Sequence, residues 1–253
     1  MSELIDGFEP AYAIPVLAGI ALALLFPSSK AFVRPEDKKR YRLIQIFTLV
    51  GAIVGAKLAV LFGDLAWPMT PLESWRQVVF SGRSITGGLI GGFLTAELLK
   101  PVMRYRLPPN DRFATVLPFS IAIGRVGCLF AGCCRGTPWD GAFAMVDAEG
   151  VARHPAPLYE LLFCVAIGGV FLLLPRRGAL YGRFFALLLI AYGVFRFLIE
   201  NVRDTPEVAF GLSGYQVLAL TMLPLGLFGL LRRVPPAPSY EPVPAPAPLL
   251  EAR

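Results

Sequence analysis

The stretch 181–200 reads YGRFFALLLIAYGVFRFLIE, and it decides the class of fold. A run of about 20 apolar residues, rising ~1.5 Å per residue, covers a hydrocarbon layer of about 30 Å. The stretch is continuously apolar instead of alternating with a period of two, which argues against a strand of a membrane barrel. We therefore expect residues 181–200 to form a transmembrane helix.

Working outward from this helix, comparable apolar runs recur along most of the chain. The seven expected spans are 11–27, 43–63, 84–100, 113–131, 157–175, 181–200 and 213–231. The composition agrees, because 55% of the 253 residues are hydrophobic and 17% are charged, against about 25% charged in a soluble domain. The mean hydropathy is +0.61. We expect an all-α integral membrane protein with seven transmembrane helices, forming one domain over 1–231.

Lysine and arginine collect in every second connection, at 28–42, 100–112 and 176–183, and again after the last span. The positive-inside rule places these segments in the cytoplasm, so the N-terminus should lie outside and the C-terminus inside. The net charge of +6 then reflects contact with anionic lipid headgroups, and we expect no nucleic-acid partner. Residues 232–253 are rich in proline and should form a disordered cytoplasmic tail.

Ionisable side chains within the expected spans are costly, so each marks a candidate functional position. They are Lys57, Glu97, Arg125, Glu160, Arg196 and Glu200. Glu97 lies one turn from Lys100 and can form an ordinary ion pair, and Lys57 can pair or extend to the membrane surface. The other four lie at the ends of spans that face the outer leaflet. Arg125 and Glu160 belong to neighbouring spans and could pair with each other.

One helix face in the 181–200 span carries a polar stripe. Tyr192, Arg196 and Glu200 are spaced by four residues, and Arg203 follows one turn further. Two or three guanidinium groups at a membrane boundary can hold a phosphate through paired N–H donors. The alternative is an Arg196–Glu200 ion pair that locks the helices together. Taken alone, these residues leave both interpretations open.

Glycines occur in two patterns with different meanings. Gly51 and Gly55 are spaced by four, and the sequence GGLIGG at 87–92 contains two more such pairs, which indicates close helix packing. Gly124, Gly127, Gly132 and Gly136 instead lie around Arg125, at the end of the fourth expected span. We expect the helix to be interrupted there, with backbone N–H groups exposed to a polar cavity.

Four cysteines and one histidine limit the metal chemistry. With His154 as the single imidazole, no site with two histidine ligands can form. The three cysteines at 128–134 and His154 could supply a zinc set, but the vicinal pair Cys133 and Cys134 is a poor chelate. We therefore expect no metal and no cofactor, and either a disulfide or ordinary buried thiols. Cys164 lies in mid-span and should pack in the core.

Several short segments occur in a characteristic order. They are SITGGL at 84–89, GRVG at 124–127, RHPAPLYE at 153–160, YGVFR at 192–196, Glu200, Arg203 and Gln216. In this order and spacing they resemble the bacterial prolipoprotein diacylglyceryl transferases, and the similarity runs from Tyr12 to Gly229. The resemblance implies an inner-membrane enzyme, with its site toward the outer leaflet. It would move the diacylglyceryl group of phosphatidylglycerol onto the thiol of a lipobox cysteine in a preprolipoprotein and release glycerol phosphate.

The resemblance also implies roles for individual residues. Arg125 matches the family's arginine that binds the phospholipid headgroup, and Tyr192 and Arg196 match an essential tyrosine and arginine. His154 and Glu160 match what looks like a structural corner near the site. The expected substrate-binding residues are Tyr12, Arg125, Arg196, Glu200 and Arg203. The candidate catalytic residues are Tyr192, Arg196, His154 and Cys133.

This chain departs from the family pattern at two places. Thr86 stands where the family has a histidine that is usually assigned as the base for the incoming thiol, and threonine cannot act as that base. After Arg125, two asparagines of the family become Cys128 and Ala131, and an acid becomes Cys133. The departures leave open which group activates the acceptor thiol.

Three mechanisms are compatible with these departures. The acceptor thiol could ionise in the field of the arginines, because nearby cations lower a thiol pKa. His154 could act as the base. Alternatively, Cys133 or Cys134 could itself be a nucleophile in a divergent paralogue that uses another acceptor. A catalytically inactive lipid-binding protein is the remaining alternative.

Overall fold

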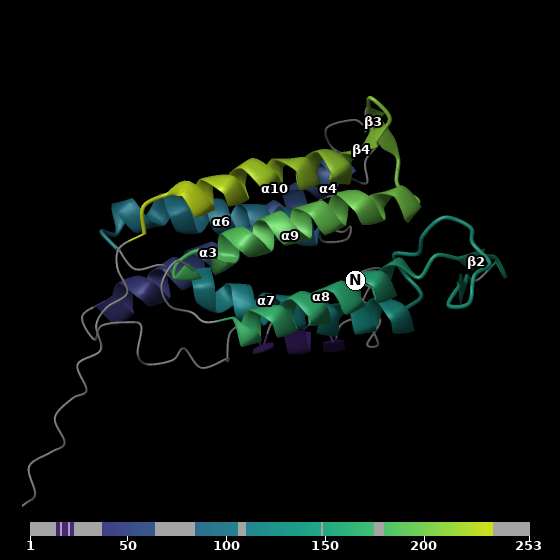
Figure 1. The fold of residues 1–253 in the computed structure, drawn as a ribbon, viewed down its shortest axis with the longest axis horizontal. Coiled ribbons are helices and arrows are strands. Elements are labelled where there is room, and N and C mark those ends of the chain that lie inside the picture. Colours follow the sequence, from purple (N-terminus) through teal and green to yellow (C-terminus); the bar gives the residue numbers. More distant parts are fainter. Residues whose placement is uncertain are drawn as a thin grey trace, which may run out of the picture.

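The structure is a computed structural model, and it describes residues 14, 15, 17–19, 21, 22, 37–63, 84–105, 110–147, 149–174 and 180–234. Its long helices lie side by side along the long axis of the molecule (Figure 1). The helices are α3 (Lys38–Leu58), α4 (Val60–Gly63), α6 (Ile85–Val102), α7 (Asn110–Phe130), α8 (Ala156–Leu173), α9 (Phe184–Ile199) and α10 (Gly214–Leu231). The 3₁₀ turn η4 (Glu200–Val202) extends α9.

Each of the last six expected spans contains a helix, which confirms the predicted helices but not that each of them crosses the membrane. Within the described residues, five segments are long and apolar enough to cross a membrane: Lys38–Gly63, Phe113–Phe130, Ala156–Leu173, Phe184–Val202 and Gly214–Leu231. The protein is thus a mostly helical, multi-pass membrane protein. The first expected span, 11–27, lies largely outside the described residues, as do Tyr12 and most of the tail. Seven spans, the orientation and the domain limits therefore stay predictions.

Helices α3 and α6 pack through the predicted glycine pairs. A Cβ atom added at Gly55 would lie 2.9 Å from the Cα of Gly91 and closer still to the carbonyl oxygen of Gly87. One added at Gly91 would collide with the carbonyl oxygen of Gly51. Only glycine permits this backbone approach, as expected for helices whose association in lipid depends on close packing.

The interior of the bundle is apolar and aromatic. Phe184, Leu189 and Met222 are fully buried, and the Phe93 and Phe185 rings stack at 5.8 Å. Cys164 belongs to the same core, which confirms its predicted packing role. The predicted Glu97–Lys100 ion pair is present at 2.5 Å, and Arg232 joins Glu97 as well.

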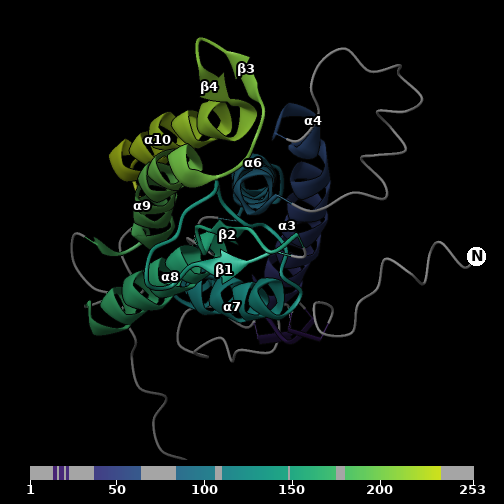
Figure 2. The same ribbon diagram turned by 90° about the vertical axis from the view of Figure 1, so that its right-hand side faces the viewer.

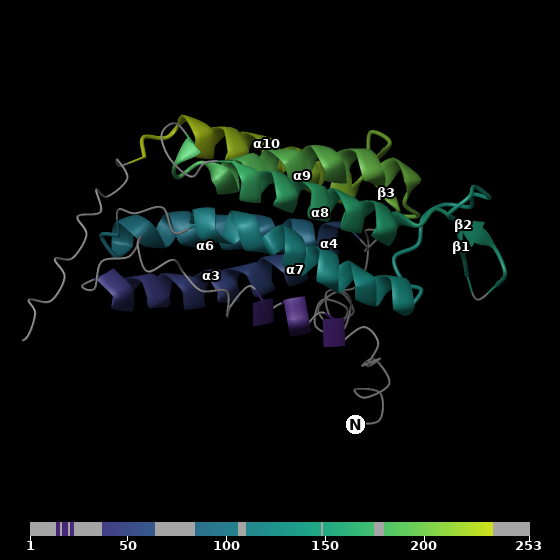
Figure 3. The ribbon, with the colours of Figure 1, turned by 60° about the horizontal axis from the view of Figure 1, so that its bottom comes forward.

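Two short hairpins cap one end of the bundle (Figures 1 and 3). Strand β1 (Met145–Val146) pairs with β2 (Ala152–Arg153) between α7 and α8, and β3 (Glu207–Ala209) pairs with β4 (Leu212–Ser213) between α9 and α10. Viewed from this end, α7 and α8 lie together, and so do α9 and α10 (Figure 2). The C-terminal ends of α7 and α9 therefore meet the N-terminal ends of α8 and α10.

The predicted interruption of the helix at Arg125 is wrong. Helix α7 continues through Gly124 and Gly127 and ends at Phe130. Gly124 has open space around its Cα atom, so this glycine marks neither a close packing contact nor a break. Arg125 projects from an intact helix, and its backbone N–H group is not free for a ligand.

Candidate functional site

Glu160 occupies the centre of a charged cluster at the capped end of the bundle. Its carboxylate is 1% exposed and lies on the first turns of α8. Arg125 from α7 places Nη2 2.7 Å from Glu160 Oε2, and the Tyr192 hydroxyl of α9 donates to Oε1 at 2.7 Å. Arg196 Nη1 lies 3.9 Å from Oε2. One carboxylate thereby joins three helices.

Glu200 forms a second centre one turn further along α9. Arg196 Nη2 lies 2.8 Å from its Oε2, and Arg203 Nε lies 3.6 Å from the same atom. Thr205 donates its hydroxyl hydrogen to Oε1 at 2.7 Å. The stripe predicted from the spacing of four is confirmed, and both of the expected ion pairs, Arg196 with Glu200 and Arg125 with Glu160, are present.

Some N–H donors of the three arginines make no hydrogen bond to a described residue despite the ion pairs. Three guanidinium groups, none more than 12% exposed, share the two carboxylates of Glu160 and Glu200. Among the described residues, Nε of Arg125 and both Nε and Nη1 of Arg196 make no hydrogen bond. Buried polar groups are normally hydrogen-bonded, so free N–H groups in such a cluster indicate a place for an anion.

The loop after α7 is held against the cluster by backbone hydrogen bonds. The Gly136 N–H group donates to the carbonyl oxygen of His154 at 2.9 Å, and Thr137 N–H donates to Val202 at 2.9 Å. Gly136 also forms a β-bridge with Arg203. A Cβ atom at Gly136 would clash with the backbone of Val202 and lie 2.6 Å from the Cβ of His154, so only glycine fits.

A network around Asp147 fixes the β1–β2 hairpin. Asp147 accepts from the Val151 N–H group at 2.7 Å and pairs with Arg153 at 2.5 Å and with Arg135 at 3.7 Å. Arg153 also reaches Asp204 at 3.4 Å. These contacts connect the hairpin to the segment after η4, which keeps the loop ordered beside the site.

His154 is held by aromatic neighbours. Its imidazole stacks on Trp139 with centroids 4.5 Å apart, and Nδ1 lies 3.3 Å from the Tyr159 hydroxyl. Within the described part of the chain, no hydrogen bond or ion pair joins the imidazole to Arg125 or Glu160. The imidazole is thus held in place by Trp139 and Tyr159.

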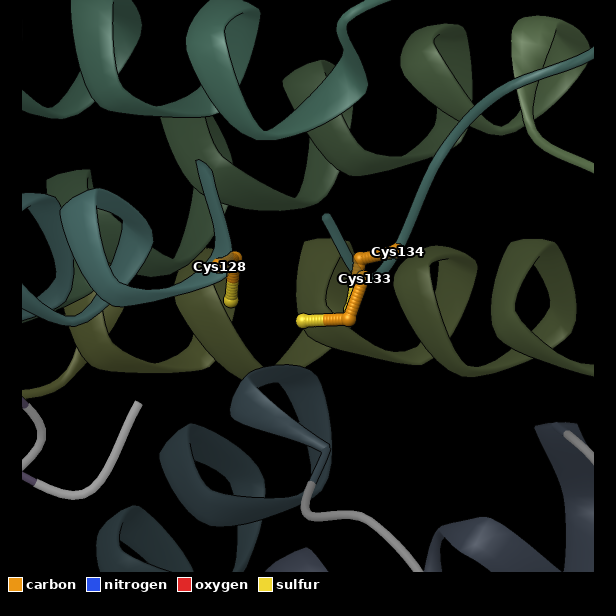
Figure 4. A group of neighbouring side chains, drawn as sticks. All are labelled: Cys128, Cys133 and Cys134. Atoms are coloured by element: carbon orange, nitrogen blue, oxygen red, sulfur yellow. The ribbon is translucent and has the colours of Figure 1, made fainter. Parts of the chain in front are cut away.

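Three cysteines lie together at the end of α7 and in the loop that follows it (Figure 4). Cys128, Cys133 and Cys134 carry free thiols, and their sulfur atoms all lie within 4.8 Å of one another. Arg125 Nη1 lies 3.6 Å from Cys128 Sγ, so the thiols adjoin the charged cluster. The candidate residue Cys133 thus has its sulfur within 4.8 Å of Cys128, which contacts Arg125, and the described cysteines form no disulfide.

The thiols outside the helix have opposite pKa shifts. Hydrogen bonds from Cys128 and Cys133 lower the pKa of Cys134 below its ordinary value, and the charges of Arg125 and Arg203 act in the same direction. Hydrogen bonds with Cys128 and Cys134 raise the pKa of Cys133, and its partial burial adds to this.

Two contributors to the site were not anticipated from the sequence. The guanidinium carbon of Arg196 lies 4.9 Å from the ring centroid of Tyr215, on the first turn of α10, in a cation–π contact. Thr205 fixes Glu200 from beyond η4. Gln216, the next residue, forms a capping box with Ser213. The Tyr215 ring therefore lies on the first turn of a helix whose N-terminus is capped.

The comparisons with known proteins agree with this arrangement. Residues 10–232 match the family described as prolipoprotein diacylglyceryl transferase. The chain belongs to this family. It is 31% identical over 243 residues to the phosphatidylglycerol–prolipoprotein diacylglyceryl transferase of Coxiella burnetii (strain Dugway 5J108-111), covering 87% of this chain and 88% of the relative.

Other relatives carry the same name. The protein of Polynucleobacter asymbioticus is 34% identical over 200 residues, covering 73% of this chain and 74% of its own. That of Clostridium tetani is 25% identical over 225 residues, covering 86% and 90%. Thr86, at the position where the resemblance implies a histidine, is 1% exposed at the start of α6.

Proposed function

We propose that this protein transfers the diacylglyceryl group of phosphatidylglycerol to the thiol of a prolipoprotein cysteine and releases glycerol phosphate. The observation that carries the proposal is the set of three buried arginines that share two carboxylates and keep unpartnered N–H groups. The family and the names of the relatives agree with this chemistry. Phosphatidylglycerol and preprolipoproteins are the proposed partners, with no nucleic acid.

The arginines suit the phosphate of the lipid headgroup. A guanidinium group presents its donors in a planar fork that matches phosphate oxygens. When the acceptor sulfur attacks the glyceryl carbon, the C–O bond breaks and its electron pair leaves with the phosphate. Arg125 and Arg196 are placed to stabilise that developing charge, which is the usual source of catalysis at such sites. Arg203 and Glu200 complete the proposed headgroup site, together with Tyr12 from the first span.

Tyr192 is proposed to position Arg125 and not to react itself. Its hydroxyl hydrogen is committed to Glu160, which in turn fixes Arg125. The tyrosine thereby sets the direction in which the guanidinium group points. His154 and Cys133 remain the candidate groups for activating the acceptor thiol. The substitutions His154→Phe and Cys133→Ser distinguish between them.

The proposed topology follows from the charge distribution. We propose seven spans in the bacterial inner membrane, with the N-terminus outside and the 232–253 tail in the cytoplasm. The cluster then lies at the outer leaflet, beneath the two hairpins. Phosphatidylglycerol would reach it by lateral diffusion, and the acceptor cysteine would arrive from the outer surface of the membrane.

Complementation tests the proposal directly. The full chain is expressed in cells depleted of their own diacylglyceryl transferase, and the mass of a reporter prolipoprotein is followed. We expect conversion by the wild-type chain, loss of conversion in Arg125→Ala, and full conversion in Arg40→Ala, whose exposed side chain pairs, among the described residues, with Asp37 alone. A membrane-inserted wild-type chain that converts no prolipoprotein would overturn the proposal.

One observation favours a second candidate function. Thr86 cannot replace the family's histidine as a base, which suits a protein that binds phospholipid without transferring it. Binding of phosphatidylglycerol to purified protein, lost in Arg125→Ala, together with no conversion of the reporter, would support this alternative.

A further inference from the structure

The backbone conformation after α7 brings the three thiols together. Helix α7 ends at Phe130, and the Cys133 N–H group then donates to the carbonyl oxygen of Cys128 at 3.2 Å, which brings the chain back beside the helix end. Cys134 has a φ of 60°, in the left-handed region that non-glycine residues rarely adopt. This turn lets both members of the vicinal pair direct their sulfurs to one place, and Figure 4 shows the Cys133 sulfur directed toward Cys128.

We propose that Cys128, Cys133 and Cys134 hold a zinc ion whose fourth coordination position receives the acceptor thiol. The identity of that fourth ligand rests on the proposed transferase function, whereas the metal site itself does not. Zn²⁺ prefers thiolate ligands in tetrahedral geometry, and catalytic sites keep three protein ligands and an open position. Nothing in the family assignment supplies such a site, because the family pattern has other residues at 128 and 133.

The distances suit zinc. With Zn–S bonds of ~2.3 Å, sulfurs of a tetrahedral site lie about 3.8 Å apart. The three sulfurs are already within 4.8 Å of one another, so small side-chain rotations close the site. Neighbouring cysteines are ordinarily a poor chelate, and the left-handed backbone at Cys134 is the feature that brings both sulfurs to one place here.

The residues around the three thiols leave the fourth coordination position of the zinc ion open. His154, the other soft ligand in this region, is not part of the group and instead stacks on Trp139. Cys128 is buried, whereas Cys134 is exposed, so the ion would be reached from one side only. Arg125 Nη1 lies 3.6 Å from Cys128 Sγ, so the three thiols adjoin the arginine cluster.

A zinc ion at this place would supply what Thr86 cannot. A thiol that coordinates zinc is deprotonated outright, and the proton passes to solvent. The zinc-bound thiolate then attacks the glyceryl carbon, an S–C bond forms, the C–O bond breaks, and glycerol phosphate leaves with the electron pair. The thioether product is a weak ligand, so water replaces it on the ion. No oxidation or reduction takes place.

Metal binding can be measured without any transferase activity. The full chain is purified in detergent under reducing conditions and given Zn²⁺ alone, and bound zinc is determined by elemental analysis. Co²⁺ replacement should give the absorption bands of thiolate-bound cobalt. We expect one equivalent of zinc per chain and protection of three thiols from alkylation. Protection is read on the wild-type chain, so it does not depend on whether a variant folds.

Single substitutions locate the ligands. Cys133→Ser and Cys134→Ser should weaken zinc binding by more than about 100-fold, since substituting a residue that merely hydrogen-bonds to a metal ligand already costs 10–100-fold. Cys164→Ser is the matched control, because Cys164 is a free thiol buried in the core of α8, outside the group. Equal zinc content in all three variants, or a disulfide within the group in protein taken directly from membranes, would overturn the metal site.

The activity assay then separates the two proposals. Zinc binding without prolipoprotein conversion leaves the metal site standing and rejects the transferase function. Conversion that survives Cys133→Ser and removal of zinc leaves the transferase function standing and rejects the role of the ion. Conversion that is lost on removal of zinc and restored by adding it supports both.

Discussion

Tyr192 and Glu160 form a buried hydrogen bond of 2.7 Å between α9 and α8, and the other oxygen of the same carboxylate pairs with Arg125 at 2.7 Å. A single side chain thus sets the positions of a tyrosine and an arginine that come from different helices. Because the carboxylate is 1% exposed, its charge is balanced almost entirely by these partners. The geometry of the headgroup site therefore depends on Glu160.

Replacing Glu160 by glutamine should destabilise the protein strongly. The substitution keeps the shape but leaves Arg125 and Arg196 with too little negative charge, and breaking a buried pair costs about 3–5 kcal/mol. Unfolding of purified protein in detergent measures this free energy. The control is Glu149→Gln, whose exposed carboxylate lies 3.9 Å from Arg135 and should change stability by less than about 1 kcal/mol. Equal stability of the two variants would contradict the role of Glu160.

Tyr192→Phe tests the hydroxyl group separately from the ring. The ring packs near Phe163 and Phe195, and phenylalanine keeps these contacts. Loss of the hydrogen bond to a charged group should cost about 1.5–3 kcal/mol of stability. It should also lower kcat more than it changes KM, because Arg125 loses its fixed orientation. Tyr105→Phe is the control, since the Tyr105 hydroxyl makes no hydrogen bond within the described residues, and it should be close to wild type in both measurements.

Gly91→Ala and Gly88→Ala form a matched pair at the α3–α6 interface. A Cβ atom at Gly91 would lie 3.0 Å from the Cα of Gly55 and closer to the carbonyl oxygen of Gly51, so the helices must separate, at a cost of about 1–3 kcal/mol. At Gly88 the nearest atoms are 3.5 Å and 3.6 Å away, in Ala52 and Ala56, which is ordinary contact. That variant should gain about 0.5–1 kcal/mol from its better helix propensity. Thermal unfolding of the two variants should therefore shift in opposite directions.

The helices and the arginine stripe could be predicted because they depend on local pattern. Apolar runs of the right length fix the helices, and a spacing of four places Arg196 and Glu200 on one face whatever the neighbours are. The central role of Glu160 could not be predicted in the same way, because it depends on how α7, α8 and α9 meet. The grouping of the cysteines depends on one backbone torsion at Cys134, which residue type does not reveal.

The continuity of α7 shows a limit of reading glycine from sequence. Gly124 and Gly127 resemble the interrupting glycines of broken membrane helices, yet the helix passes through both. Glycine lowers helix propensity by at most ~1 kcal/mol, and bundle packing in an apolar solvent outweighs this. The real change of direction comes at Gly132, whose φ is 61°, five residues after Gly127.

His154→Phe decides whether the single imidazole serves as the base for the acceptor thiol. A general base contributes about 10²–10⁴-fold to a rate, so a catalytic His154 would lose at least that much activity. We expect a far smaller loss, because phenylalanine preserves the stack on Trp139 and the backbone of residue 154 still bonds to Gly136 and Thr137. His154→Gly should be worse than His154→Phe, since it removes the stack that positions the loop carrying Cys133. The measurement is the rate of prolipoprotein conversion by each purified variant across pH. The contrary outcome is that His154→Phe loses as much activity as Arg125→Ala and has a changed pH profile. That outcome would show that the imidazole takes the proton from the acceptor thiol and does more than hold the loop.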